Sequence, residues 1–310
     1  MEARCNLIVD SCCDLPFDTI DKAGVQLIRF PYVLDGEEKT DDLYRTTTPK
    51  DFYDAMRDKR KLAPTTAQVP ATALIDAFRA AYESGVPTVY LCFSSGLSGS
   101  FDTAVLVRDQ LAQEYPEGEL YIVDTMLASI AEGLLVLAAI DQRNAGLTGA
   151  ELAAWAEEAR WFVNAQFMLD DLESLRRGGR IPAGIATAGA KLDVKPMLGF
   201  SLQGGLSMVG MSRGRKKGVR AMVDYFHRRS DSEAVARRVI VGHADAASDA
   251  KRLREELLKT EHGLVFTDTF VGPVIGSHVG PGMVAVAFWG PDRREEIGVA
   301  ERIARRIKSE

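Results

Sequence analysis

Four short segments hold the side chains of this chain that could do chemistry: residues 10–14 (DSCCD), 64–68 (PTTAQ), 94–100 (SSGLSGS) and 276–282 (GSHVGPG). Each follows a predicted strand or lies between two. Residues 94–100 stand between a predicted strand and a predicted helix, which brings hydroxyl groups and free backbone N–H groups to a helix N-terminus. That arrangement suits a carboxylate or a phosphate. The other interpretation is N-capping of the helix by Ser98 or Ser100, and the residues leave both open.

His278 is the histidine that lies in a glycine-rich segment, which would let backbone approach a ligand closely. A structural histidine is the competing interpretation. A serine nucleophile would need an adjacent base with a third orienting group, and neither that acid nor a Gly-x-Ser-x-Gly motif is identifiable. Residues 94–100 also match neither a dinucleotide fingerprint nor a phosphate-binding P-loop.

Positive charge is concentrated between residues 176 and 229. This stretch has twelve Lys or Arg residues against two acids, so its local charge is +10 in a chain whose net charge is −6. Two glycine-punctuated clusters, 176–180 (RRGGR) and 213–218 (RGRKKG), contain Arg180, Arg213, Arg215, Lys216 and Lys217. A basic region on an acidic protein indicates an anionic ligand or an acidic partner, although a solvated helix face is the alternative.

The length and composition restrict the class of protein. A chain of 310 residues with 46% hydrophobic and 26% charged residues is typical of globular proteins and long enough for two domains. It has no apolar run long enough to cross a bilayer and no signal-peptide pattern at its start, so we expect a cytoplasmic protein without stable membrane insertion. The four cysteines lack metal-ligand spacing, so buried, reduced thiols are expected and a metal site is not.

The first half of the chain alternates between strand and helix patterns. Strands are predicted at residues 6–10, 25–34, 88–93 and 120–123, and helices at 48–57, 72–83, 101–115, 128–140 and 148–160. The last of these helices begins with a Thr-x-x-Glu capping box. Strands that bracket helices at this spacing indicate a mostly parallel sheet flanked by helices.

The second half mixes hairpins with helices, which predicts an α+β domain. Strands are expected at residues 165–168, 194–200, 206–211, 239–242, 264–270 and 283–289, and helices at 171–177, 215–229 and 246–259. We place the division between the domains at residues 1–160 and 161–310. The tail after Trp289 has apolar residues near helical spacing and is predicted to form a terminal helix.

Seven collinear motifs resemble the DegV family of bacterial fatty-acid-binding proteins, and the resemblance covers roughly residues 6–289. The motifs are IVDS with DLP (8–16), SSGLSG (94–99), VDT with GLLV (123–136), LRRGGRI (175–181), KPML (195–198), RGRKKG (213–218) and GSHVGPG (276–282). The segment that is usually Thr-Ser-Gln-Pro departs from the pattern, since it is Thr66-Ala67-Gln68-Val69 here. That departure leaves open whether Thr65 or Thr66 points inward.

The resemblance implies a carrier with no catalytic residues and no cofactor. It would hold one long-chain fatty acid, with the carboxylate at the domain interface and the acyl chain in a buried tunnel. It would present this ligand to a separate, dihydroxyacetone-kinase-like fatty acid kinase that uses ATP. The residues implied for the carboxylate site are Ser11, Thr65 or Thr66, Ser94, Ser95, Arg213 and His278, with Asp10 beside Ser11. Those implied for the kinase are Arg180, Arg215, Lys216 and Lys217.

Two other functions compete with the carrier. One is a lipid-ester hydrolase that uses Ser95 and His278, which the missing acid and the missing nucleophile motif disfavour. The other is a nucleic-acid-binding module, which the negative net charge and the lack of aromatic residues among the basic clusters disfavour.

Overall fold

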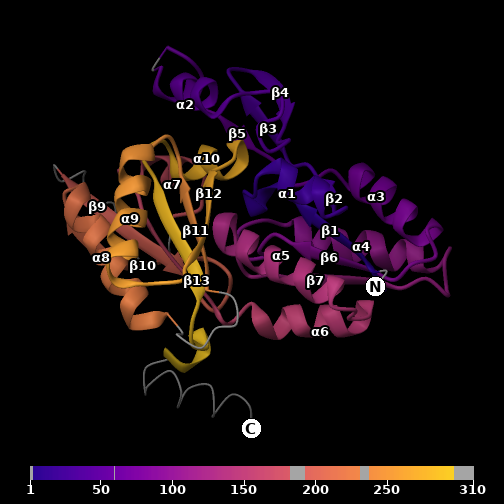
Figure 1. The fold of residues 1–310 in the computed structure, drawn as a ribbon. Coiled ribbons are helices and arrows are strands. Elements are labelled where there is room, and N and C mark those ends of the chain that lie inside the picture. The colour runs from indigo at the N-terminus through magenta and orange to yellow at the C-terminus, as the bar shows by residue number, and fades with distance from the viewer. Residues whose placement is uncertain (1–2, 59, 182–192, 231–236, 297–310) are drawn as a thin grey trace, which may run out of the picture.

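The computed structural model describes residues 3–58, 60–181, 193–230 and 237–296, and shows two β-sheets side by side (Figure 1). The first sheet is parallel, with strand order β2-β1-β6-β7. Its strands are β1 (Asn6–Asp10), β2 (Gln26–Ile28), β6 (Thr88–Cys92) and β7 (Leu120–Asp124). Its helices are α1 (Phe17–Lys22), α3 (Ala71–Glu83), α4 (Ser100–Ala112), α5 (Ser129–Asn144) and α6 (Gly149–Ala159). Every residue of β6 is buried, as expected for a central parallel strand covered on both faces.

The second sheet has six strands in the order β10-β9-β8-β13-β11-β12, and all neighbours are antiparallel except β11 and β12. Its strands are β8 (Val163–Met168), β9 (Val194–Phe200), β10 (Leu206–Arg213), β11 (Arg238–His243), β12 (Val265–Phe270) and β13 (Val284–Trp289). Helices α8 (Arg215–Arg229) and α9 (Ala247–Thr260) pack on one face through Met222, Phe226 and Leu253. Helix α5 contacts β8, β11 and β13, and so joins this sheet to the first half of the chain.

A small third sheet lies beside the place where the two halves meet (Figure 1). Its antiparallel strands are β4 (Glu37–Thr40), β3 (Pro31–Leu34) and β5 (Thr65–Thr66). Helix α2 (Pro49–Arg57) of the first half and α10 (Pro273–Val279) of the second half pack together beside it. Segments far apart in sequence are thereby brought to one end of the molecule.

The prediction of one strand over residues 25–34 was wrong. The run is divided between β2 in the first sheet and β3 in the third. Pro31 starts β3; a proline has no N–H for a ladder and restricts the residue before it, so the chain turns here. The N–H of Phe30 leaves the ladder and donates to Ser11 Oγ at 3.1 Å.

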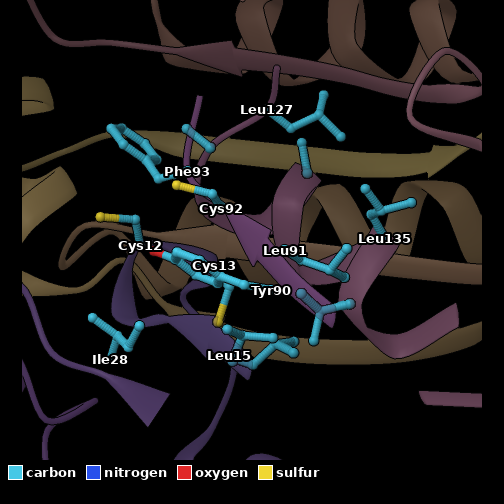
Figure 2. Packing of buried hydrophobic residues seen from close by; sticks show 14 of the residues in the cluster. Cys12, Cys13, Leu15, Ile28, Tyr90, Leu91, Cys92, Phe93, Leu127 and Leu135 are labelled. Carbon is cyan, nitrogen blue, oxygen red and sulfur yellow. The ribbon is translucent and has the colours of Figure 1, made fainter. Parts of the chain in front are cut away.

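The core of the first half surrounds the ends of β1 and β6 (Figure 2). Cys12, Cys13 and Cys92 lie there among Tyr90 and Leu135, with no exposed surface. All four cysteines of the chain are free and buried, which confirms that prediction. Burial raises the pKa of the Cys12, Cys13 and Cys92 thiols well above the usual range, so these groups pack as small apolar side chains.

The predicted fold class is confirmed: a helix-flanked parallel sheet comes first and a mixed α+β region follows. The capping box of Thr148 and Glu151 forms, and the predicted helix at residues 215–229 has those bounds. The division at 160/161 stays a prediction; α6 ends at Ala159 and β8 begins at Val163. A 3-10 helix, η2 (Arg293–Glu296), follows β13, and the predicted terminal helix lies outside the described residues.

Candidate ligand-binding site

A cavity of about 200 Å³ lies between the two halves of the chain. Its apolar walls come from Phe30, Phe93, Leu97, Ala128, Ile130 and Ala131 of the first half and from Ala165, Phe167, Leu175, Phe200, Leu206, Val274, Ile275, Val279, Met283 and Ala285 of the second. Its polar lining side chains are Thr66, Gln68, Ser98, Ser129, Arg180 and His278. Gln68 and Arg180 are exposed whereas most apolar lining residues are buried, so these two side chains mark the end nearest solvent. Ser129 is buried, and its hydroxyl donates to Asp14.

Helix α10 carries His278 into this polar end. Residues 276–282 were predicted to be a loop, and that was wrong: α10 runs to Val279 and includes His278 in its last turn. Pro273 begins the helix and Gly280, at φ 74°, ends it, which is the usual placing of these residues. Gly276 is required within the helix, because a Cβ there would lie 2.7 Å from Tyr53 Oη.

Strand β5 decides which of the two threonines faces the cavity. The segment was predicted to be a loop, but Thr65 and Thr66 pair with Val33 and Tyr32 of β3. Successive side chains of a strand point to opposite faces. Thr65 is therefore exposed, whereas Thr66 lines the cavity and its Oγ1 lies 2.7 Å from His278 Nε2.

The imidazole of His278 is neutral at neutral pH. Burial, and secondarily the positive charge of Arg180, lower its pKa to about 4. Its Nδ1 atom is buried without a hydrogen-bond partner, and Gly178 packs so closely that a Cβ would lie 2.1 Å from this atom. A proton on Nδ1 would be buried without an acceptor. We therefore place the proton on Nε2, which donates to Thr66 and leaves the threonine hydrogen free to donate into the cavity.

Two positive groups lie at the same end. The Arg180 side chain lines the cavity and donates to the carbonyls of Leu97 at 3.1 Å and Gly178 at 2.7 Å. Helix α4 begins beside the cavity with Gly99 as its N-cap, and no side chain caps it. Ser98 Oγ nevertheless accepts from the N–H of Ser100, the first residue of the helix, at 3.2 Å, so part of the predicted serine capping is present, and the partial positive charge of the helix N-terminus favours an anion.

The other serines singled out in the sequence form hydrogen bonds within the protein, and none lines the cavity. Ser95 Oγ donates to Asp124 Oδ2 at 2.5 Å. Ser94 Oγ donates to the Gly204 carbonyl at 2.9 Å, and Ser11 Oγ accepts from Phe30. Ser98 and Gly99, a few residues further on, line the cavity instead. Their segment was identifiable from sequence, but the residues facing inward were not.

The predicted basic residues also divide. Arg213 is exposed at the end of β10 and does not line the cavity, and Lys216 and Lys217 are exposed at the start of α8. Arg215 has an internal role: it pairs with Asp170 and Asp249, both at 2.5 Å, and donates to the Gly282 carbonyl. Its guanidinium therefore joins three segments of the second half.

The geometry does not assemble a serine hydrolase. Ser95 bonds to Asp124 and His278 bonds to Thr66, so the two proposed catalytic side chains have different partners. No group of three or more His, Cys, Asp or Glu residues within the described segments could hold a metal ion. Among the same residues, no helix is both long and apolar enough to span a bilayer.

These features define an α/β protein with two main sheets, a small third sheet, and an apolar cavity between its halves that has hydrogen-bond donors at one end. The family model described as "Uncharacterised protein, DegV family" matches residues 4–290, so the chain belongs to the DegV family. A DegV domain-containing protein of Clostridium perfringens, CPE0026, is 32% identical over 92% of this chain and 97% of its own length.

Solved structures of two relatives carry the same fold. A DegV family protein from Thermus thermophilus, described for its fatty acid binding, has a TM-score of 0.81 and 28% identity, covering 93% of this chain and all of its own. A Thermotoga maritima protein, described as revealing a fatty acid binding function, has a TM-score of 0.78 and 26% identity, covering 94% and 100%. The resemblance drawn from the seven motifs is thereby confirmed at the level of the family.

Proposed function

We propose that this protein binds a single long-chain fatty acid, with its carboxylate at the Thr66–His278 end of the cavity and its acyl chain along the apolar walls. The observation that carries this proposal is an apolar cavity whose hydrogen-bond donors are gathered at one end. The fatty acid binding described for the Thermus and Thermotoga relatives supports it.

The cavity wall suits an acyl chain energetically. Each methylene removed from water contributes about 0.8 kcal/mol, so a chain of many methylenes supplies most of the affinity. Rings from both halves line the route, including Phe30, Phe93 and Phe167. The polar end then fixes which way the chain lies.

The polar end suits a carboxylate. Thr66 offers a hydroxyl hydrogen, Arg180 adds a positive charge, and the N-terminus of α4 adds its dipole. Neutral His278 orients the threonine rather than acting as an ion partner. Binding of this kind needs no catalytic group, and we propose that the protein is a carrier and not an enzyme.

Native mass spectrometry of the purified protein tests the proposal. We expect a bound mass equal to an ordinary fatty acid. Thr66→Val should weaken retention by roughly 10- to 100-fold, because a hydrogen bond to a charged group is worth about 1.5–3 kcal/mol. His278→Ala should also weaken it, because the Thr66 hydroxyl loses the group that orients it. His262→Ala, at an exposed turn, is the matched control. A protein without bound acid that also fails to take up added fatty acid would contradict the proposal.

We propose further that the carrier presents its ligand to a separate ATP-dependent fatty acid kinase. The exposed charges of Arg213, Lys216 and Lys217 support this, because they lie in the stretch with a local charge of +10 and are not used in the cavity. Arg180 lies at the cavity end that such a partner would need to reach.

Charge-reversal variants test fatty acid binding and contact with the kinase separately. We expect Lys216→Glu with Lys217→Glu to keep fatty acid binding and to lower acyl-phosphate formation in an assay with the kinase of the host. Arg215 is left intact because its ion pairs hold the second half together. The double variant Lys251→Glu and Lys259→Glu, on exposed positions of α9, is the control. If acyl-phosphate forms equally fast with the natural protein and with both double variants, Lys216 and Lys217 do not belong to the surface that contacts the kinase.

A further inference from the structure

A second cavity, of about 290 Å³, lies on the opposite face of the second sheet from the first. Leu206 of β10 lines the first cavity and the next residue, Ser207, lines the second, since successive side chains of a strand point to opposite faces. Tyr225 of α8 also lines the second cavity. Ala165 and Phe200 contribute to both because they belong to the strands that lie between them. The second cavity is therefore on the face that α8 covers.

A buried arginine lines this second cavity. Arg293, in η2, is 8% exposed, and its Nε atom has no hydrogen-bond partner. Its two Nη atoms donate to main-chain carbonyls, of Phe200 at a long 3.5 Å and of Arg160 at 3.2 Å. The guanidinium also lies over the Trp161 ring, with Cζ 5.6 Å from the ring centroid. These contacts leave it with hydrogen-bond donors that are not used within the protein.

The charge of Arg293 also lacks a direct partner, because no carboxylate within the described residues forms a salt bridge with it. The neighbouring Asp292 bonds instead to Arg294, at 2.9 and 2.8 Å. Burial lowers the pKa of Arg293 to about 10, and the charge of Asp292 offsets this only in part. An isolated charge inside a protein is costly, and buried arginines are normally paired. An anion in the cavity would supply that partner.

A second polar side chain on this face has a buried atom without a partner. Gln166 is 7% exposed, and its Oε1 has no hydrogen bond. It lies two residues before Met168, which packs against α8, so both side chains point to the same face. Met168 pairs with Met197, and continuing this antiparallel register places Gln166 opposite Gly199, which lines the cavity. Unpartnered buried polar atoms in a native protein call for a water, an ion or a ligand.

We propose that the second cavity binds a small organic oxyanion, a carboxylate or a phosphate ester, whose charged group bonds the guanidinium of Arg293. Arginine recognises both groups through two parallel hydrogen bonds. Ser207 offers a further polar contact, and the Tyr225 ring and Val209 offer an apolar surface for the rest of the molecule. A cavity of about 290 Å³ is near the small end of the usual range for ligand sites, about 300–1,000 Å³, and so suits a compact molecule. This site does not depend on the proposed fatty acid binding.

Isothermal titration calorimetry with benzoate and with phenyl phosphate tests the site. We expect at least one of them to bind, and the tighter of the two identifies the preferred oxyanion. Arg293→Met should weaken its binding at least about tenfold, because the probe loses its charged donor. Arg228→Met, at an exposed position of α8, is the control and should change the affinity less than about twofold. The affinity should stay the same when a long-chain fatty acid is present, and competition between the two would overturn the inference.

A second pair of variants covers the case in which Arg293→Met fails to fold. Val209→Asp puts a negative charge on the cavity wall, at a half-exposed position of the edge strand β10, and should weaken binding by about fivefold. Met211→Asp adds the same charge to the other face of β10, because Met211 pairs with Pro196 and the neighbouring Met197 faces α8. It should have little effect. Failure of both probes to bind, or equal affinity in the natural protein and both aspartate variants, would overturn the inference while leaving fatty acid binding in place.

Discussion

Two groups of polar side chains lie close to the cavity, and their hydrogen bonds differ. The first group surrounds Asp10, which lies at the end of β1 and is fully buried. Its carboxylate accepts hydrogen bonds from the N–H groups of Cys12 at 3.0 Å and Phe93 at 2.8 Å, and from Tyr90 Oη at 3.1 Å. At the polar end, Thr66 and His278 bond to each other, and the ring keeps a buried nitrogen without a partner.

Whether a polar side chain already has hydrogen-bond partners within the protein distinguishes a structural residue from a ligand-binding one better than its residue type does. Asp10 and its buried neighbour Asp41 have their lone pairs occupied by backbone N–H groups, so they fix the loops that carry them. Thr66 has a hydrogen to give and faces the cavity. Spare hydrogen-bonding capacity toward a cavity is what a bound carboxylate would use.

The largest effect should come from removing a fully engaged carboxylate. Asp10→Ala leaves the Cys12 and Phe93 N–H groups and the Tyr90 hydroxyl buried without their acceptor. We expect the free energy of unfolding to fall by about 3–5 kcal/mol, since each buried, unsatisfied donor costs about 1–3 kcal/mol. Urea denaturation followed by circular dichroism measures it.

The control for Asp10 is Asp18→Ala, because Asp18 is on the surface with 80% of its side chain exposed. Its pair with Lys22 should contribute less than about 1 kcal/mol. If Asp10→Ala proved as harmless as this control, the assignment of the β1 carboxylate to a structural role would fail, and a role in ligand binding would become the better explanation.

Three of the four segments that the sequence singled out line the cavity. Thr66 and Gln68, Ser98 and Gly99, and His278 come from segments singled out by their composition. The fourth segment, residues 10–14, lines no part of the cavity. Short-range patterns such as the hairpin before residue 214 and the helix after it were also predictable, because turn and capping residues mark their ends.

Which side chains within a segment face the cavity was not predictable, because partners distant in sequence decide it. Ser94 turns away because the carbonyl of Gly204, 110 residues further on, accepts its hydrogen. Thr66 turns inward because β5 pairs with β3, and the sequence gives no sign of a two-residue strand. Arg180 was assigned to a partner surface from the family resemblance, yet its side chain lines the cavity.

A second prediction concerns a carboxylate that has no such partners. Glu132 in α5 has no exposed surface, and neither carboxylate oxygen has a hydrogen-bond partner. Burial, with the nearby charges of Asp10 and Asp14, raises its pKa well above the usual range. We expect Glu132→Leu to raise the free energy of unfolding at neutral pH by about 1–3 kcal/mol, the cost of burying an unpaired polar group. Glu132→Gln removes the titration but keeps a polar group, so it should stabilise less.

These carboxylates also set the sign of the pH dependence. Burial raises the pKa of Asp41 to about 7, and that of Glu132 is raised as well. An acid with a raised folded pKa binds more protons when folded, so stability falls as pH rises from its unfolded pKa, about 4, toward the folded value. The pKa of His278 is lowered in the folded protein, so its contribution to stability increases with pH, but only below its unfolded pKa of about 6.5. From about pH 6.5 to about pH 8, the free energy of unfolding should therefore decrease, and less steeply in Glu132→Leu. Equal slopes would mean that Glu132 is ionised in the folded protein.

The smallest effect tests a serine that belongs to the structural group although it lies beside the cavity. Ser94 donates to the Gly204 carbonyl in the turn of the β9–β10 hairpin, whose Phe200 and Leu206 form part of the cavity wall. The fit is close, because a Cβ at Gly204 would lie 2.3 Å from Ser94 Oγ. Ser94→Ala should lower the free energy of unfolding by about 1 kcal/mol, the net value of one hydrogen bond. It should also speed release of a fluorescent fatty acid in stopped-flow displacement, because the hairpin is held less firmly.

Thr72→Ala removes an exposed hydroxyl from the first turn of α3 and is the control for Ser94. Equilibrium affinity separates the two explanations that a faster release would allow. If Ser94 holds the hairpin, association and release should both speed up and affinity should change little, because the lost bond is absent from the ligand contacts. If Ser94 instead touches the carboxylate, release alone should speed up and affinity should fall with it. The second pattern would mean that Ser94, like Thr66, bonds the ligand. The distinction between side chains bonded within the protein and side chains available to a ligand would then not hold at this loop.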